Sequence, residues 1–368
     1  MTGCPLRGLL CEISSDQNHK GSAEMSDTKP VIHLVGSIPL DDAETVFRTL
    51  GQRVGHHAER IPDGETGRRQ RWISFVMDQL KANPAFEVDQ SLPPFQFTQF
   101  DGTVVYEIPR LTIKDGVDPK TITFETGYAE DAIRNFAIFD RLQSAGDIPA
   151  GVKYQIDMAT PLAITYNFMV PAVYDSFVEI YTDHLAAEFA RIQESLPHDR
   201  ISYQWDVCQE VLMWEGYYDQ FPDYKEQIFS VLGRIGGMVP ADIDLGYHLC
   251  YGSPKDEHMV LPDDMGNLVE IANGIVAAVL RPVQYIHMPV PKGSNDDAFF
   301  APLAGLAMGD TRLYLGLVHA GDGDGSAAKL ATARKYATVS GVATECGMGR
   351  GDPGIFEPAL DISLNLVS

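Results

Sequence analysis

The sequence predicts an α/β fold, a (β/α)8 TIM barrel with an insertion after its second strand. Three observations support this prediction: the chain length, the number of strand-like runs and the helical spacing between them. At 368 residues the chain is long enough for such a barrel, which needs about 250 residues and often carries additions. Hydrophobic residues make up 45% of the chain and charged residues 21%, as expected for a globular protein with a sizeable core.

The strand-like runs are short and rich in β-branched and aromatic residues. They span residues 31–38, 58–65, 152–161, 201–210, 243–252, 282–291, 312–321 and 340–349. Between them, apolar residues recur every three to four positions and predict helices over 172–196, 267–280 and 327–339. Strands that alternate with helices in this way favour a barrel. Residues 30–368 are therefore predicted to form a single barrel domain.

Two segments do not follow this alternation. Residues 1–29 are polar and aperiodic, and we expect them to be a flexible N-terminal extension. Residues 66–151 are too many for one helix. Within this stretch, residues 97–116 alternate like a hairpin, and a helix is predicted near 128–144. We therefore expect an insertion at about 86–150 that covers part of the barrel mouth.

Charge and cysteine content exclude several classes of protein. The chain has 51 Asp and Glu against 28 Lys and Arg, and this net charge of −23 opposes binding to nucleic acid or to an anionic membrane. No apolar run reaches the roughly 18 residues that span a bilayer, and the five scattered cysteines are no disulfide framework. We expect a cytoplasmic protein without a nucleic-acid or membrane partner, and its oligomeric state is not predicted.

Histidines and cysteines stand at the ends of three runs. His248 and Cys250 are two positions apart, so they point to the same side of a strand. His287 and Cys346 end the sixth and eighth runs. A single buried cysteine is common, but parallel inward-facing strands would bring all four side chains together at the carboxyl ends, where barrels hold their active sites. Two thiolates and two imidazoles predict a Zn²⁺ site.

Two of these motifs resemble the cobalamin-independent methionine synthase family, specifically its C-terminal zinc barrel, within the wider uroporphyrinogen decarboxylase-like group. His248-Leu249-Cys250-Tyr251 is similar to the family's His-x-Cys-Tyr, and Glu345-Cys346-Gly347 to its late cysteine motif. The resemblance spans roughly residues 30–350 but is specific only in short motifs. The family has a glutamate ligand where this chain has His287, which implies a less negative zinc centre here.

The resemblance also implies roles for other polar residues. "QWDVCQE" is similar to the family's Gln-x-Asp segment, which implies that Asp206 holds a substrate amino group with Glu210 nearby. "PDGE" implies that Glu65, with Asp63, contacts the same substrate, and "GLVH" implies that His319 donates a proton. The catalytic residues are thus predicted to be His319, Asp206 and Glu210.

Each of these residues also has a structural interpretation. Asp206 and Glu210 could be capping or solvated carboxylates, and His319 could make a core hydrogen bond. Asp63 and Glu65 could form a structural network with nearby arginines. Arg350, close to the predicted metal, is a candidate for contact with a substrate carboxylate.

Three functions remain open. The leading hypothesis is a zinc-dependent enzyme that activates a small thiol for methyl or alkyl transfer, with a thiol or amino acid as its small-molecule substrate. The second is zinc-assisted hydrolysis, hydration or elimination on a small polar substrate. The third is a non-catalytic zinc-binding barrel in which four protein ligands close the site.

Overall fold

The computed structural model describes residues 29–254 and 257–368. The predicted extension, residues 1–29, therefore lies outside the described residues except for Lys29. The central sheet of the described chain has eight strands, all parallel: β1 (Val31–Ile32), β2 (Arg60–Pro62), β7 (Lys153–Ala159), β8 (Ile201–Val207), β9 (Asp244–Leu249), β10 (Tyr285–Pro289), β11 (Arg312–Val318) and β12 (Val339–Thr344). Seven lie within the predicted runs, and β12 begins one residue earlier than its run.

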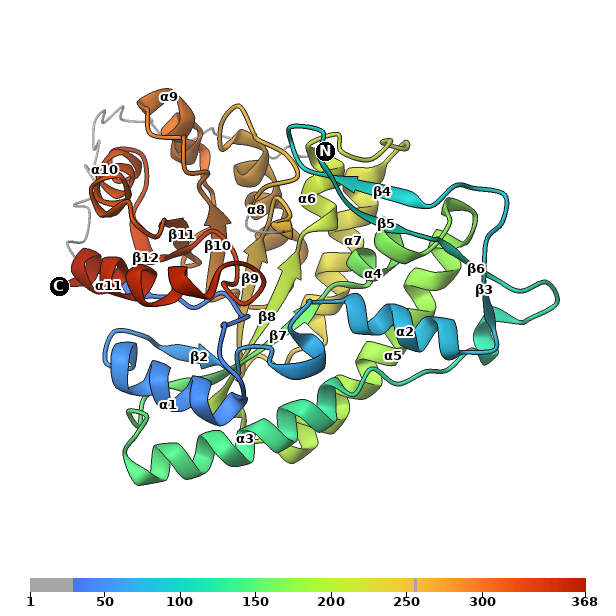
Figure 1. Ribbon diagram of the computed structural model, residues 1–368, viewed down its shortest axis with the longest axis horizontal. Helices are drawn as coiled ribbons and strands as arrows, with labels where there is room; N and C mark the ends of the chain where they lie inside the picture. The colour runs from blue at the N-terminus through green and yellow to red at the C-terminus, as the bar shows by residue number, and fades with distance from the viewer. Residues whose placement is uncertain (1–28, 255–256) are drawn as a thin grey trace, which may run out of the picture.

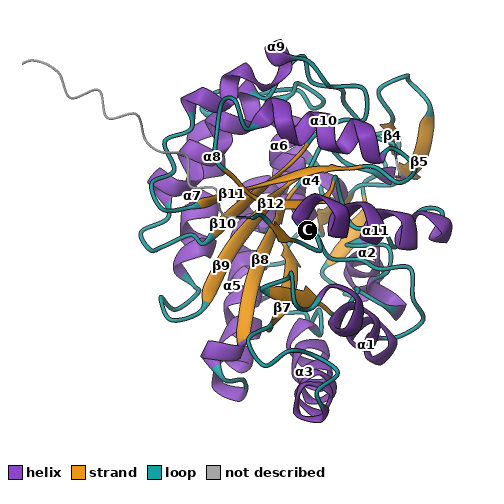
Figure 2. Ribbon diagram, turned by 90° about the vertical axis from the view of Figure 1, so that its left-hand side faces the viewer, coloured by secondary structure: helices purple, strands orange, loops and turns teal. Residues whose placement is uncertain are grey.

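The strands follow one another around a curled sheet in the order β1-β12-β11-β10-β9-β8-β7-β2. Figures 1 and 2 show this curl, with the strands enclosed by helices. The two edge strands approach each other, because Ile32 N donates to His57 O at 2.7 Å just before β2. Beyond β1, Ile38 N donates to Gly64 O at 3.0 Å. The α/β class with a curled parallel sheet, consistent with a barrel, is confirmed.

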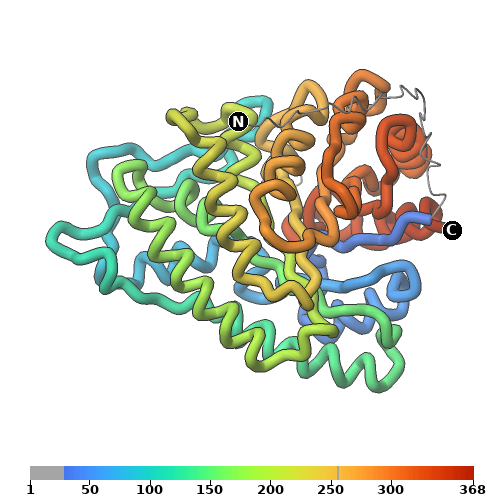
Figure 3. The backbone as a smooth tube through the Cα atoms, turned by 180° about the vertical axis from the view of Figure 1, so that it is seen from behind, coloured from blue at the N-terminus to red at the C-terminus, as the bar shows by residue number. Residues whose placement is uncertain are grey.

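The longer helices cover the outer face of the sheet. They are α1 (Ala43–Val54), α3 (Tyr128–Ala145), α5 (Tyr174–Ser195), α7 (Tyr224–Gly237), α8 (Gly266–Ala278), α10 (Gly323–Ala333) and α11 (Phe356–Val367). Figure 3 shows α7 and α8 packed side by side on the face seen from behind. The helices predicted over 172–196 and 267–280 correspond to α5 and α8, but α10 lies earlier than predicted. Its start is set by Asp322, whose side chain accepts a hydrogen bond from Gly325 N.

Strand β8 shows how polar side chains of this sheet come to face the interior of the curl. All seven of its residues are buried, because helices cover one face and side chains fill the other. Tyr203 and Trp205 face outward and pack against Phe189 of α5, with ring centroids 4.5 and 5.2 Å away. Gln204 and Asp206 alternate with them and therefore face the interior. The interior end of the strand thus carries an amide and a carboxylate.

The segment between β2 and β7 holds α2 (Ser74–Ala82) and two small antiparallel sheets. β4 (Phe95–Thr98) pairs with β5 (Val104–Ile108), and β3 (Phe86–Val88) pairs with β6 (Leu111–Ile113). The predicted hairpin over 97–116 is therefore two different pairings, since its last strand returns to β3. These strands lie on one side of the molecule, at the right of Figure 1, whereas α3 packs against α1 and α5.

Four shorter helices lie nearer the ends of the strands or in their connections. α4 (Pro161–Phe168) and α6 (Gln209–Trp214) follow β7 and β8 directly, and α9 (Asp297–Phe300) precedes β11, while α2 follows β2. Across the described parts of the chain, no helix combines the length and apolar character needed to cross a bilayer.

Candidate metal centre and its pocket

A cavity of about 630 Å³ opens at the carboxyl ends of the strands. Its walls come from the loops after β1, β2, β8, β9 and β12, and from the β4–β5 hairpin, which contributes Phe97 and Tyr106. The hairpin is tied to the loop after β9, because Gln99 Nε2 donates to Pro254 O at 2.9 Å and Phe100 N donates to His258 O at 3.1 Å. The hairpin and that loop therefore border the cavity together, whereas the insertion over about 86–150 stays a prediction.

One imidazole and two thiols meet in this cavity. The ligand atoms of His248, Cys250 and Cys346 all lie within 4.8 Å of one another, and all three residues line the cavity. The two Sγ atoms are 3.6 Å apart, and His248 Nε2 is 3.7 Å from Cys346 Sγ. His248 lies in β9, Cys250 directly follows the last residue of that strand, and Cys346 follows β12. Among the described residues, these three side chains form the one group of His, Cys, Asp or Glu close enough together to hold a metal ion.

His287, the fourth predicted ligand, lies outside this group. It is fully buried, and its Nδ1 is 2.7 Å from His248 Nδ1. The parallel register of β9 and β10 places His287 directly beside His248, two residues below the level of Cys250. Alternation along a strand specifies the side to which a residue points, but not its height in the neighbouring strand. The structure therefore brings three of the four predicted ligands together.

The two thiols strongly influence each other's protonation. Cys250 and burial raise the pKa of the Cys346 thiol to about 12, although Arg350 lowers it. Cys208 and burial likewise raise the pKa of Cys250 above its usual range. Two thiolates this close repel each other, and a metal cation bound by both would offset that repulsion. One imidazole and two thiols form a donor set that fits Zn²⁺, and three protein ligands are typical of catalytic zinc sites.

Arg350 contributes a buried positive charge beside the thiols. Its Nη2 is 2.8 Å from Cys346 Sγ, and its Nη1 is 3.3 Å from Ser37 Oγ and 3.9 Å from Glu65 Oε2. Burial lowers its pKa, but Cys346 and Glu65 outweigh this effect, so the guanidinium remains charged. Arg350, Ser37 and Glu65 all line the cavity.

Two predicted substrate-binding carboxylates also line the cavity, Glu65 and Asp206. Asp206 accepts hydrogen bonds from Trp72 Nε1 at 3.2 Å and from Gln204 Nε2 at 3.1 Å. Burial is the largest cause that raises the pKa of both carboxyls, and the charge of Glu65 raises that of Asp206 further. Glu65 and Trp72 have positive φ angles of 49° and 53°, which non-glycine residues rarely adopt. The loop after β2 thus holds acidic and aromatic groups in a strained conformation.

A further carboxylate, Asp157 near the end of β7, was missed by the sequence reasoning; it lies beside these two but does not itself line the cavity. A Cβ placed on Gly36 would lie 3.4 Å from Asp157 Oδ2 and 3.6 Å from Glu65 Cδ, so both carboxylates flank one space. Burial, then Asp206 and Glu65, raise the pKa of Asp157 well above its usual range. A signal was present, because Gln-x-Asp occurs both in β7 and in β8, and Asp157 is paired in register with Gln204.

Asp63, also predicted to bind substrate, lies within a protein network. Its carboxylate accepts hydrogen bonds from Arg69, from Asn135 Nδ2 at 2.7 Å and from Tyr154 Oη at 2.9 Å. It also accepts from Glu65 N at 3.0 Å. Asp63 does not line the cavity. These contacts correspond to the structural interpretation, in which Asp63 supports the loop that carries Glu65.

Glu210, a predicted catalytic residue, points away from the cavity as well. It is fully buried in the first turn of α6, where Thr160 Oγ1 donates to its Oε1 and its Oε2 has no hydrogen-bond partner. Burial raises its pKa to about 7, against the lowering effect of Thr160. Glu210 does not line the cavity.

His319 contacts Glu345, the residue that precedes the candidate ligand Cys346. Its ring Nε2 is 3.0 Å from Val290 O, and its Nδ1 is 3.4 Å from Glu345 Oε2. The other oxygen of Glu345 is 2.5 Å from Nε2 of His258, a residue that sequence reasoning missed because its loop has no periodic pattern. Neither histidine lines the cavity, but Glu345 immediately precedes Cys346. The predicted proton donor is therefore linked to the site through Glu345.

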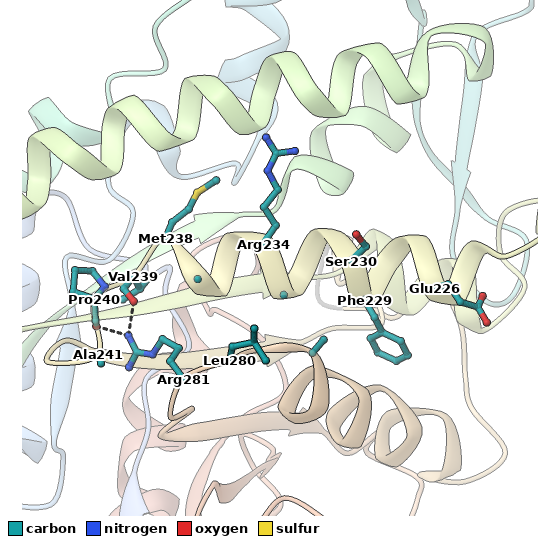
Figure 4. A pocket seen from close by; sticks show the side chains of 13 residues that line it. Glu226, Phe229, Ser230, Arg234, Met238, Val239, Pro240, Ala241, Leu280 and Arg281 are labelled. Carbon is teal, nitrogen blue, oxygen red and sulfur yellow. Dashed lines mark hydrogen bonds between the residues drawn. The ribbon is translucent and has the colours of Figure 1, made fainter.

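A second, more open hollow of about 840 Å³ runs along α7, from Glu226 to residues 239–241 and 280–281, which precede β9 and β10. Figure 4 shows Arg281 there with hydrogen bonds to the carbonyls of Val239 and Pro240. Its lining holds no histidine or cysteine. The chemistry of the described chain is therefore concentrated at the carboxyl end of the sheet.

Together, the curled parallel sheet and the His-Cys-Cys group define an α/β protein with a candidate metal centre in a pocket at the carboxyl ends of its strands. No protein-family model and no curated protein matches the chain. Several solved structures, however, match the chain. A protein assigned as a vitamin-B12-independent methionine synthase from Listeria monocytogenes matches with a TM-score of 0.56 and 14% identity, over 93% of this chain and 98% of that one.

Two further structures share the fold. A B12-independent methionine synthase from Shewanella sp. W3-18-1, in complex with selenomethionine, has a TM-score of 0.56 and 12% identity, over 92% of this chain and 96% of that one. A methyltransferase from Methanosarcina mazei has a TM-score of 0.53 and 10% identity, over 93% and 95%. The chain therefore has the fold of methionine synthase-like methyltransferases over almost its whole length.

Proposed function

We propose that this protein is a zinc-dependent enzyme that transfers a methyl or other alkyl group to or from a small thiol. The observation that carries the proposal is the group of His248, Cys250 and Cys346, whose ligand atoms meet within 4.8 Å inside a pocket. The shared fold with methionine synthases and a methyltransferase supports the same reaction class.

The metal would be held by His248 Nε2 and by the two cysteine sulfurs. When bound, zinc lowers the pKa of a thiol at this site, so that the thiol is a nucleophilic thiolate near neutral pH. Arg350 assists by holding positive charge 2.8 Å from Cys346 Sγ. The β4–β5 hairpin covers the pocket and limits the access of water to the reacting thiolate.

The remaining lining residues suit an amino acid. Glu65 and Asp206, with Asp157 beside them, form a buried acidic region that favours an ammonium group. Arg350 is the buried cation that we propose for the substrate carboxylate. One structural relative was solved with selenomethionine, which is an amino acid. We therefore propose an amino acid that carries a thiol or thioether as the substrate.

Zinc-assisted hydrolysis or elimination is the second candidate, and one observation favours it. The group provides three protein donors, a number that also suits zinc sites that activate water. The two reactions differ in their need for a thiol. The non-catalytic barrel is less well supported, because it requires a fourth protein ligand and His287 lies outside the group.

The decisive experiment measures metal content and thiol alkylation in the same preparations. The wild-type chain is expected to carry about one zinc, and Cys250→Ala and Cys346→Ala are expected to lose most of it. Cys208→Ala is the comparison variant: Cys208 is also buried and lines the pocket beside Cys250 but is outside the group, so this variant is expected to keep its zinc. Homocysteine and cysteine are then offered with methyl iodide, and zinc-dependent S-methylation is measured.

Two results would contradict the proposal. The first is wild-type protein without transition metal after expression in zinc-supplemented medium. The second is equal zinc content in Cys346→Ala and Cys208→Ala. Zinc-dependent turnover of an ester or amide without any added thiol would favour the hydrolytic alternative instead.

A further inference from the structure

His248, one of the three candidate metal ligands, forms a buried pair of imidazoles with His287. Their Nδ1 atoms are 2.7 Å apart, and their ring centroids are 4.8 Å apart. The relative exposures of the two residues are 3% and 0%, so water does not compete for this contact. A hydrogen bond between two ring nitrogens needs one N–H donor and one lone pair. The position of one proton therefore determines which ring nitrogens donate a hydrogen bond and which present a lone pair.

The geometry indicates which ring donates. His248 Nε2 faces the thiols, at 3.7 Å from Cys346 Sγ, whereas its Nδ1 faces His287. A nitrogen that binds a metal must present its lone pair. The proton of a neutral His248 must then sit on Nδ1 and be donated to His287 Nδ1. The reverse arrangement would put the proton on His248 Nε2 and block metal binding.

The surroundings fix the position of the His287 ring. A Cβ placed on Gly316 of β11 would lie only 2.7 Å from His287 Nε2, so the imidazole fills the space that this glycine leaves. The His33 ring lies on another side, with its centroid 5.6 Å from that of His287. The direct register of β9 and β10 sets the height of the ring beside His248. His287 thus has little freedom to turn toward the thiols.

We propose that His287 is a positioning residue, which fixes the tautomer and orientation of His248 so that Nε2 is presented to the metal. It accepts the Nδ1–H of His248 and is not itself a ligand. The inference rests on the proposed zinc site and deepens it. The protein then contributes three donors, as catalytic zinc sites do, and the thiol substrate supplies the next one.

The test compares His287→Gln with His287→Leu in the full-length protein. Glutamine offers an amide oxygen that can accept the Nδ1–H, and leucine offers no acceptor. Zinc affinity, measured with a competing chelator, is expected to fall about 10- to 100-fold in the leucine variant and much less in the glutamine variant. Cobalt-substituted protein is expected to keep its two-thiolate charge-transfer absorption in both variants. His184→Leu is the matched control, because His184 on α5 has a largely covered side chain, 8% exposed, that bonds to Thr126.

A second measurement does not depend on the metal. Nitrogen-15 spectra of histidine-labelled apoprotein are expected to show His248 protonated on Nδ1 in the wild type and a changed tautomer population in His287→Leu. Protonation on Nε2 in the wild type would overturn the inference. So would wild-type zinc affinity in the leucine variant, or X-ray absorption showing two imidazole ligands. Wild-type protein that binds no metal refutes the proposed function, whereas a metal-bound protein indifferent to residue 287 refutes this inference alone.

Discussion

Arg350 Nη2 lies 2.8 Å from Cys346 Sγ, which places a buried positive charge next to a candidate metal ligand. This charge lowers the pKa of the thiol, although Cys250 and burial raise it overall. Arg350 therefore favours the thiolate form that a metal needs. It also reaches toward Glu65, so the same guanidinium connects the thiols with the acidic side of the pocket.

Arg350→Gln is expected to weaken zinc binding about tenfold at pH 7, because the Cys346 thiolate loses its neighbouring charge. The loss should stay nearly constant from pH 6.5 to 8.5, because the pKa of the Cys346 thiol, about 12, lies above this range in the metal-free protein. Chelator competition at pH 6.5, 7.5 and 8.5 measures this. Arg281→Gln, in the second hollow and before β10, is the control. Zinc affinity in Arg350→Gln equal to that of the wild type at all three pH values would contradict the electrostatic explanation.

Asp157→Asn is expected to raise the melting temperature by a few degrees and to weaken amino-acid binding about tenfold or more. Burial and three neighbouring carboxylates disfavour its charge, so the amide removes repulsion as well as a partner for an ammonium group. Thermal unfolding and calorimetric titration with methionine measure the two effects. Asp140→Asn, at an exposed carboxylate paired with Arg200, should change neither. Unchanged methionine affinity would exclude Asp157 from the substrate site.

Glu210→Gln is expected to change the pH dependence of stability. The folded-state pKa of about 7 lies above the ordinary 4.5, so the folded state binds this proton more tightly than the unfolded chain does. The contribution of the carboxyl to stability is therefore fully present below pH 4.5 and is lost as the pH rises to about 7. The variant should gain relative stability over that interval, on the order of 3 kcal/mol at most. Urea unfolding at several pH values measures this difference, and a constant difference would contradict it.

Asp63→Ala is expected to destabilise the fold by about 3–5 kcal/mol, because it leaves Arg69 buried without this partner. Zinc content should remain near that of the wild type, since Asp63 is outside the metal-ligating group. Denaturant unfolding and metal analysis of the same samples provide the test. A stable variant that loses only substrate affinity would restore Asp63 as a binding residue.

Much of the fold could be predicted because each strand is a short buried run with its own pattern. The side to which His248 and Cys250 point could also be predicted, since alternation along one strand is a local property. The place of His287 could not, because its height depends on the register between β9 and β10. Register is set by packing between strands that are far apart in the sequence.

The acidic region shows the same limit. Asp206 was recognised from a motif in one strand, but Asp157 becomes significant only when β7 and β8 are known to be neighbours. Glu210 follows Asp206 by four residues, yet the chain turns into α6 between them and carries Glu210 away from the pocket. Proximity in sequence did not predict proximity at the site.

The left-handed backbone at Glu65 and Trp72 has a thermodynamic consequence for ligand capture. Each such conformation costs on the order of 1–3 kcal/mol, and it is maintained without a ligand by hydrogen bonds from Glu65 N to Asp63 and from Trp72 N to Arg69 O. The loop after β2, which carries Glu65, is therefore ordered when the chain folds. An incoming ammonium group meets side chains that need no rearrangement, so association should lose little conformational entropy. Free and ligand-bound forms of this loop should superimpose closely.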